Sequence, residues 1–221
     1  MLPAINLTKA HRAKRIAAVT KWFEDQHCWE LTIFSDEKRF SLDGPDDWRS
    51  YIPMSKNFYR NKRQCGGGSL LVWLLVMPNG LLSYRIIEGN LNADKYIDLL
   101  RTTAVPIMKL NYRENFVFQE DNSPVHKAHK VKNFLQTSKI KVLEWPAKSP
   151  DLNITEDVWK LLSDLVYDGP PYQNKASLAE RIKDVITEVN QRKRNIIQNL
   201  YVGMRSRLYK VLIRQGGLCN K

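Results

Sequence analysis

The spacing of hydrophobic residues changes along the chain between helix-like and strand-like patterns, and it predicts a mixed α/β protein. A period of three to four residues marks helices, whereas alternation or a short continuous apolar run marks strands. By these rules we expect helices at 7–27, 92–110, 124–137, 154–167, 177–190 and 194–214. We expect strands at 29–42, 69–77, 81–88, 116–118 and 141–145.

Turn-forming residues refine this pattern. The two strands on either side of Pro78-Asn79-Gly80 should form a β-hairpin, because Asn-Gly is a strong hairpin signal. The first of these strands, 69–77, is apolar on both faces and therefore belongs in the centre of a sheet. Pro106 should interrupt or kink its helix, and Pro124 should lie in the first turn of the next helix.

The order of these elements predicts an α/β fold with a mixed β-sheet and helices on both faces. Three strands of antiparallel character come first, and strand–helix units follow them. Three segments are expected: a basic linker and helix at 1–28, the α/β core at 29–190, and a basic C-terminal helix and tail at 191–221.

Charge separates the two ends from the centre. The net charge is +12, yet residues 1–21 contain five Lys or Arg and residues 191–221 contain eight, with no acid in either segment. Two basic ends beside a near-neutral body suggest that the chain binds a polyanion, although solubility or a nuclear address would also explain them. No apolar run reaches the roughly 18 residues of a membrane span, and the three isolated cysteines fit a reducing compartment.

Three acids far apart in the sequence are candidates for one metal site. Asp36 lies within a predicted strand, Asp121 follows another, and Glu156 lies in the first turn of a predicted helix. Open α/β sheets place their sites at strand ends, so these side chains can meet there. Mg²⁺ and Mn²⁺ prefer oxygen ligands, and a pair of such ions suits the displacement of a phosphodiester oxygen. The sequence therefore predicts a two-metal site.

Each acid also has an ordinary structural explanation. Asp36 can be a surface residue on a strand, Asp121 can start a turn, and Glu156 can complete a capping box at the start of its helix. The adjacent acids Glu37 and Glu120 should face the other side of the sheet, because side chains alternate along a strand.

Five motifs resemble the catalytic domain of mariner-superfamily DDE transposases, in the Sleeping Beauty-like branch. They are Phe34–Phe40, Gly66–Ser69 before Val72-Trp73, Gly89–Tyr96, Phe118–His126 and Trp145–Asn153. The resemblance runs from about Leu7 to the C-terminus, and 34 residues separate Asp121 from Glu156, similar to that branch.

The resemblance implies an RNase H-like fold and DNA transposition. In such enzymes, hydrolysis at transposon ends precedes attack of the 3′-hydroxyl on target DNA, typically at a TA step. It implies that Asp36, Asp121 and Glu156 are catalytic and hold two Mg²⁺ ions, with Mn²⁺ as a substitute. It also implies a homodimer in a synaptic complex, and action in the nucleus after passage through the cytoplasm. The candidates for positioning DNA are His126, Asn122 and Lys148.

Departures from the family pattern leave alternatives open. Ile154-Thr155 stands where the family usually has Pro-Ile, which should aim Glu156 less firmly, and Leu74-Leu75 replaces the usual Gly-Cys. The family's N-terminal helix-turn-helix modules have no counterpart in these residues. A transposase-derived DNA-binding or protein-interaction remnant without catalysis is one alternative, and a general RNase H-type nuclease is another. His126 can also be an ordinary packed residue.

Overall fold

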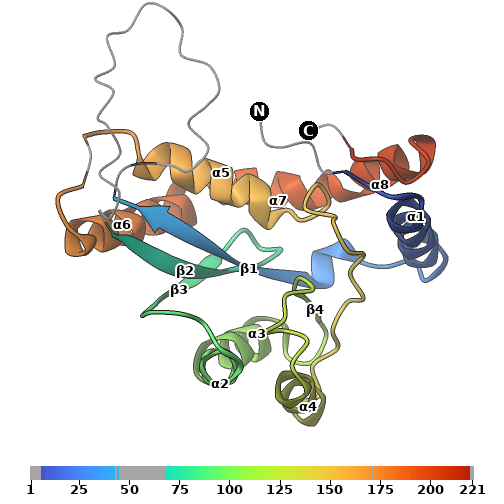
Figure 1. Ribbon diagram of the computed structural model, residues 1–221, viewed down its shortest axis with the longest axis horizontal. Helices are drawn as coiled ribbons and strands as arrows, with labels where there is room; N and C mark the ends of the chain where they lie inside the picture. The colour runs from blue at the N-terminus through green and yellow to red at the C-terminus, as the bar shows by residue number, and fades with distance from the viewer. Residues whose placement is uncertain (1–5, 43, 45–67, 171, 220–221) are drawn as a thin grey trace, which may run out of the picture.

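The computed structural model describes residues 6–42, 44, 68–170 and 172–219, so part of the Gly66–Ser69 motif lies outside the described residues. A four-stranded mixed sheet with the order β3-β2-β1-β4 forms its centre (Figure 1). β1 pairs antiparallel with β2 and parallel with β4. The strands are β1 Thr32–Ser41, β2 Ser69–Val76, β3 Leu82–Ile87 and β4 Val117–Gln119.

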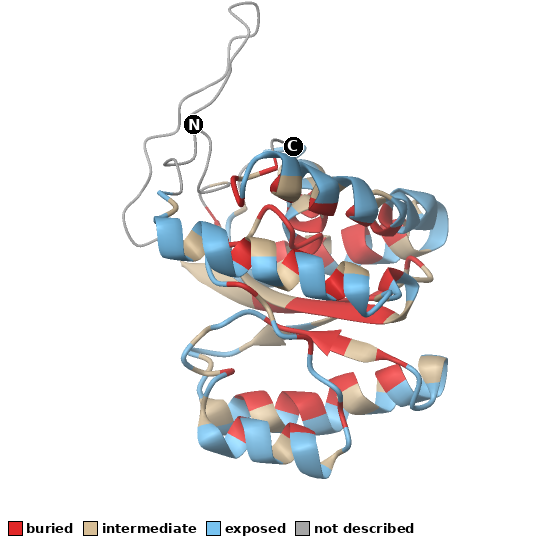
Figure 2. Cartoon of the chain, turned by 90° about the vertical axis from the view of Figure 1, so that its right-hand side faces the viewer, coloured by how far each residue is buried: buried red, intermediate tan, exposed pale blue. Residues whose placement is uncertain are grey.

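Helices cover both faces of the sheet (Figure 2). One layer consists of α1 Lys9–Glu24, α5 Thr155–Val166, α6 Lys175–Arg192, α7 Arg194–Val202 and α8 Met204–Ile213. The other layer consists of α2 Ala93–Leu99, the π-helix η2 Leu100–Ala104, α3 Val105–Tyr112 and α4 His129–Thr137. A short 3₁₀ helix, η1 Trp29–Leu31, leads into β1. None of the described helices has both the length and the apolar composition of a membrane-spanning segment.

Alternation along the strands creates a hydrophobic core on each face of the sheet. Phe34 and Leu74 point into the α1/α5–α8 layer, whereas Ile33 and Trp73 point into the α2–α4 layer. β2 lies between β1 and β3 and is buried on both faces. The prediction of a mixed sheet with β2 in its interior is therefore confirmed.

The three predicted segments of the chain pack into the same hydrophobic core. Val19 from the first segment and Ile197 and Leu208 from the last are buried in one cluster with Phe34 of the central segment. The boundaries after residues 28 and 190 stay a prediction, but the helices outside them help to cover the sheet.

Two elements predicted after β4 are shorter than expected. The helix predicted at 124–137 begins only at His129, because the Asp121 carboxylate and the Ser123 hydroxyl accept backbone N–H groups and form turns there instead. The strand predicted at 141–145 is a single parallel bridge between Phe118 and Val142. Neighbouring residues of a strand direct their backbone N–H and C=O groups to opposite edges. In the three-residue β4, only Phe118 directs these groups away from β1 and toward residues 141–143.

Two predicted helices also differ in detail. Pro106 does not break its helix, because the π-helix η2 just before it widens the turn and helix continues through α3. The helix predicted at 194–214 is divided into α7 and α8 at Gly203, a residue with low helix propensity.

Asn190 of α6 forms two hydrogen bonds with the edge strand β3. The Asn190 Oδ1 atom accepts from the Leu82 backbone N–H at 2.8 Å, and its Nδ2 donates to the Leu82 carbonyl at 2.9 Å. We expect Asn190→Ala to lower the free energy of unfolding by about 1–3 kcal/mol, because both backbone groups lose their partner. Urea denaturation will measure this, with the exposed Asn199→Ala in α7 as the control. An equal effect of both substitutions would contradict the role of Asn190.

Candidate active site

Asp36 lies in β1 and faces the start of α5. Its Oδ1 atom accepts from the Glu37 backbone N–H at 2.8 Å. Its Oδ2 atom accepts from the Asn153 amide at 3.3 Å, the Thr155 hydroxyl at 3.1 Å and the Trp159 indole N–H at 3.3 Å. The carboxylate is therefore held by four hydrogen bonds, three of which come from α5 and the loop before it.

No positive charge is among these hydrogen-bond donors. Burial, together with the nearby negative charges of Glu37 and Glu156, raises the pKa of Asp36 to about 7. Glu156 is exposed, in the first turn of α5, and close enough for its charge to act on Asp36. A buried carboxylate with two acidic neighbours is a place where a cation would be stabilising.

Asp121 lies at the same level of the sheet as Asp36. Phe34 pairs with Gln119, and each acid lies two residues beyond its strand's member of this pair. The Asp121 Oδ1 atom accepts from the Ser123 backbone N–H at 2.8 Å and lies 2.7 Å from the His126 Nδ1 atom. Burial would raise the pKa of Asp121, but these hydrogen bonds lower it below its usual value, so the group is ionised at neutral pH.

Glu37 and Glu120 lie on the opposite face of the sheet, as predicted. Glu37 faces His126, and Glu120 accepts from the Tyr96 hydroxyl at 2.6 Å. Burial raises the pKa of Glu120. Burial would lower the pKa of His126, but contacts with Asp121 and Glu37 outweigh it and raise this pKa to about 10.

The three candidates for positioning DNA differ in exposure. His126 is 3% exposed and packs on the Tyr96 ring, with ring centroids 4.5 Å apart. Asn122 is exposed, and its amide donates to the Trp145 carbonyl at 2.8 Å. Lys148 is also exposed, with a φ of 54° in the left-handed region. Only the last two present their side chains to solvent.

The donor set suits a hard divalent cation, because all three predicted ligands are carboxylates. In the part of the chain that the structure describes, no three His, Cys, Asp or Glu side chains converge closely enough to form a metal-binding group. Asp36 is held toward α5, Asp121 is held toward His126, and Glu156 is exposed. Repulsion among the three carboxylates favours this spread. The residues therefore fit the ion by the chemistry of their donor atoms.

A buried ion pair that the sequence analysis missed anchors the loop before α5. Arg15 is fully buried and binds Asp151 through two hydrogen bonds, of 2.8 and 2.7 Å. Arg15 also donates to the Gly216 carbonyl at 2.9 Å, and the Cys219 backbone N–H donates to Asp151 at 2.9 Å. The signal was the helical spacing of Arg15 with the buried Val19, which places the arginine on the apolar stripe of α1.

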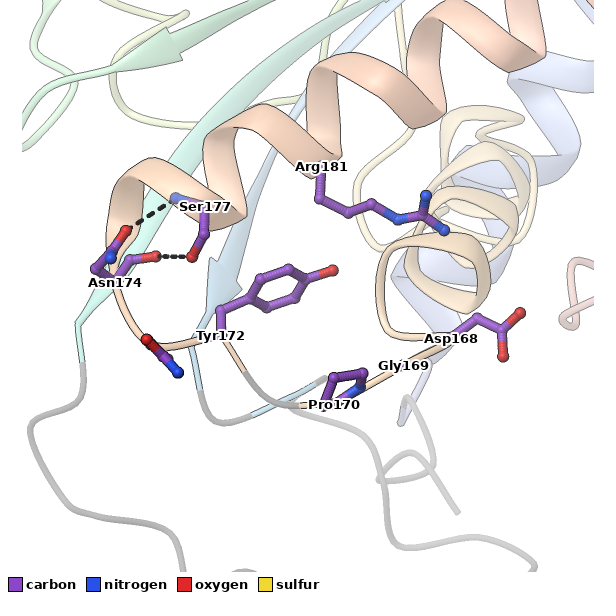
Figure 3. Close-up of a pocket in the computed structure, with 8 residues that line it drawn as sticks. Asp168, Gly169, Pro170, Tyr172, Asn174, Ser177 and Arg181 are labelled. Carbon is purple, nitrogen blue, oxygen red and sulfur yellow. Dashed lines mark hydrogen bonds between the residues drawn. The ribbon is translucent and has the colours of Figure 1, made fainter.

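Two cavities lie away from the three acids. One, of about 340 Å³, lies between the end of α5 and the start of α6 and is lined by Asp168, Tyr172 and Arg181 among others (Figure 3). The other, of about 600 Å³, lies beside the end of α1 and includes His27 and Lys141. Neither has Asp36, Asp121 or Glu156 in its lining.

Comparison with known sequences identifies a family whose matched range contains all three acids. The family model described as "DDE superfamily endonuclease" matches residues 32–179, more than half of the chain. The chain is similar to the Tc3 transposase of Caenorhabditis elegans, with 30% identity over 99% of this chain and 66% of the relative. The chain is also similar to the Tc1 transposase of the same organism, with 33% identity over 71% of this chain and 59% of the relative. The chain thus spans less than two thirds of the length of these relatives.

Comparison with solved structures concerns the fold. The Mos1 transposase paired-end complex with left transposon end gives a TM-score of 0.81 at 16% identity, covering 100% of this chain and 66% of that one. The crystal structure of the catalytic domain of Mos1 mariner transposase gives 0.68 at 14% identity, covering 96% and 95%. The RNase H-like fold predicted from the sequence is confirmed.

Proposed function

The chain belongs to the DDE superfamily endonucleases, and from this premise we propose that it is the catalytic part of a metal-dependent DNA transposase. Its reaction is cleavage of DNA at transposon ends by hydrolysis, followed by transfer of the 3′-hydroxyl strand into target DNA at TA. The observation that carries this proposal is the buried Asp36 carboxylate beside Glu156, which lies, together with Asp121, within the residues that match the family.

In the proposed mechanism, Asp36, Asp121 and Glu156 hold two Mg²⁺ ions, with Mn²⁺ as a substitute. Structures of Mos1 transposase with Mg and with Mn support this choice of metal. When bound, such ions supply charge stabilisation for the attacking and leaving oxygens of the phosphodiester. The protein contributes orientation: Thr155 and Trp159 hold the Asp36 carboxylate, and the Ser123 backbone N–H donates to Asp121.

Basic residues near the chain ends would hold the DNA. α1 and α8 pack side by side (Figure 1), and both expose basic side chains. They are Lys9, Arg12, Lys14 and Lys21 in α1 and Arg205 and Lys210 in α8, with Arg214 directly after α8. Neutralising DNA phosphates in this way gives binding that weakens steeply with salt. Asn122 and Lys148 are the exposed candidates for positioning the strand near the acids.

The biological setting follows from the proposed reaction. Relatives named as transposases, and a Mos1 paired-end complex with a transposon end, support transposon ends and target DNA as partners. We extend this to a homodimer in a synaptic complex, acting in the nucleus.

The packing before Glu156 does not favour a non-catalytic remnant. Ile154 replaces the proline that is usual in the family, yet it is fully buried, and the adjacent Thr155 donates its hydroxyl to Asp36. The start of α5 is thus fixed by packing and a hydrogen bond. Glu156, whose side chain is exposed, is the next residue after this fixed segment.

A cleavage assay with Glu156→Gln tests the proposal. Transposon-end DNA, intact or pre-nicked, should be cut in the presence of Mg²⁺ or Mn²⁺ and spared when EDTA is added. We expect Glu156→Gln to lower the cleavage rate by about 10²-fold, because it removes one charged ligand. The exposed Glu180→Gln in α6 is the matched control and should cleave normally. Cleavage that survives EDTA, or a Glu156→Gln protein with full activity, would overturn the proposal.

A further inference from the structure

A buried polar network lies between the middle of β1 and the end of β4, on the sheet face opposite Asp36. His126 is its centre: the Nδ1 atom lies 2.7 Å from Asp121 Oδ1, and the Nε2 atom lies 3.4 Å from Glu37 Oε1. The ring packs on Tyr96, whose hydroxyl donates to Glu120 at 2.6 Å. The network therefore joins β1, the end of β4, α2 and the turn before α4.

The stability of the fold does not explain why ionisable groups are buried in this network. Tyr96 is fully buried, and His126 and Glu120 are 3% and 7% exposed. Burying ionisable groups carries a desolvation cost that well-packed apolar side chains would avoid. The network touches the candidate site twice, since Glu37 adjoins Asp36 and Glu120 adjoins Asp121. Its position points to a role in the geometry of the site.

We propose that His126 is a positioning residue that fixes the Asp121 carboxylate and ties it to β1 through Glu37. This inference rests on the proposed function, because it takes Asp121 as a metal ligand. His126 acts through Asp121 and touches no DNA, since its side chain is covered by Tyr96 and the two acids. The 2.7 Å contact at Nδ1 is a hydrogen bond that fixes the Asp121 carboxylate, whereas the 3.4 Å contact at Nε2 is a longer ion-pair contact with Glu37.

Two substitutions of His126 test the roles of its two ring nitrogens separately. Asparagine places an amide nitrogen near the position of Nδ1, and glutamine places one near the position of Nε2. Both substitutions remove the ring packing on Tyr96, so a difference between them reports on the two nitrogen positions and not on the packing. His129, which is exposed in α4, provides His129→Gln as a control outside the network.

The test measures Mn²⁺ affinity from the electron paramagnetic resonance signal of free Mn²⁺, together with kcat and KM for DNA cleavage. We expect His126→Gln to weaken Mn²⁺ binding by about 10- to 100-fold, the usual effect of removing a partner of a metal ligand. We expect His126→Asn to restore binding to within about threefold of the unsubstituted protein. In His126→Gln, kcat should fall while KM for DNA stays unchanged, because DNA does not contact this residue. His129→Gln should match the unsubstituted protein.

Equal Mn²⁺ affinity of the Asn and Gln variants would overturn the positioning role. If His126→Gln does not fold, His126→Ala replaces it, and Asn should then bind Mn²⁺ at least about tenfold more tightly than Ala. Failure of the proposed function gives a different result: the unsubstituted protein would bind no Mn²⁺ that depends on Asp121. Normal binding and cleavage by the unsubstituted protein, with indistinguishable His126 variants, would refute the positioning role alone.

Discussion

Replacing Asp36 by asparagine is expected to lower the rate of metal-dependent DNA cleavage by about 10³-fold or more, the scale seen when a catalytic group is removed. Asparagine keeps the size of the side chain but removes the charge that a divalent ion requires. The loss should exceed that of Glu156→Gln, because Asp36 is the most firmly held of the three acids, with four hydrogen bonds.

The same substitution should leave the fold intact. Asparagine removes a buried negative charge that lies near Glu37 and Glu156, which favours folding, but it loses one hydrogen-bond acceptor. These effects oppose one another, so we expect the melting temperature to change by only about 2–4 °C, which corresponds to about 1 kcal/mol in a chain of this size. Calorimetry and a cleavage assay on the same sample measure both quantities, with the exposed Asp164→Asn in α5 as control. Cleavage by a folded Asp36→Asn protein at the normal rate would contradict the assignment.

The largest effect on stability is expected from Arg15→Met. This substitution leaves the Asp151 carboxylate buried without its cationic partner and should lower the free energy of unfolding by about 3–5 kcal/mol. Urea denaturation at neutral pH measures the loss. Arg12, exposed one turn earlier in α1, gives the control Arg12→Met.

The effect of Arg15→Met should depend on pH in a defined direction. Burial would raise the pKa of Asp151, but hydrogen bonds from Arg15 and the Cys219 backbone hold it below its usual value. The folded state therefore binds this proton less readily than the unfolded state, and the pair stabilises the protein fully above about pH 4. The difference between Arg15→Met and the unsubstituted protein should shrink as the pH falls through the lowered pKa.

A double variant distinguishes an unpaired charge from lost packing. Arg15→Met with Asp151→Leu removes both charges, so stability should recover relative to Arg15→Met alone. No recovery would mean that the hydrogen bonds of Arg15 to the Gly216 and Gly217 carbonyls, rather than the ion pair, account for the loss.

The sequence was sufficient for the sheet and for the location of the acids, because local rules decide both. The hairpin followed from Asn79-Gly80, and the interior position of β2 followed from its two apolar faces. Asp36 was placed inside a strand and Glu156 in the first turn of a helix, as the structure has them. These features depend on residues close to one another in the chain.

The features that the sequence did not predict depend on long-range contacts. Arg15 looked like one of several basic residues near the N-terminus, since its partner Asp151 lies 136 residues away. His126 was predicted as a candidate for positioning DNA, but its contact with Glu37 was not predicted, because that contact requires β1 and β4 to be neighbours. Helix α4 begins later than its sequence pattern predicts, because the Asp121 and Ser123 side chains accept hydrogen bonds from backbone N–H groups in the turn before it.

The ion pair of Arg15 also sets an order of events during synthesis of the chain. Arg15 emerges from the ribosome about two hundred residues before its partners at Gly216 and Gly217. Until then α1 carries a cationic side chain on its apolar face with part of its hydrogen-bonding environment missing. Domains fold as units once their sequence is available, so docking of α1 should be among the last steps. During translation the apolar face of α1, which includes Val19 and Trp22, stays uncovered until that step and is a surface for chaperones to bind.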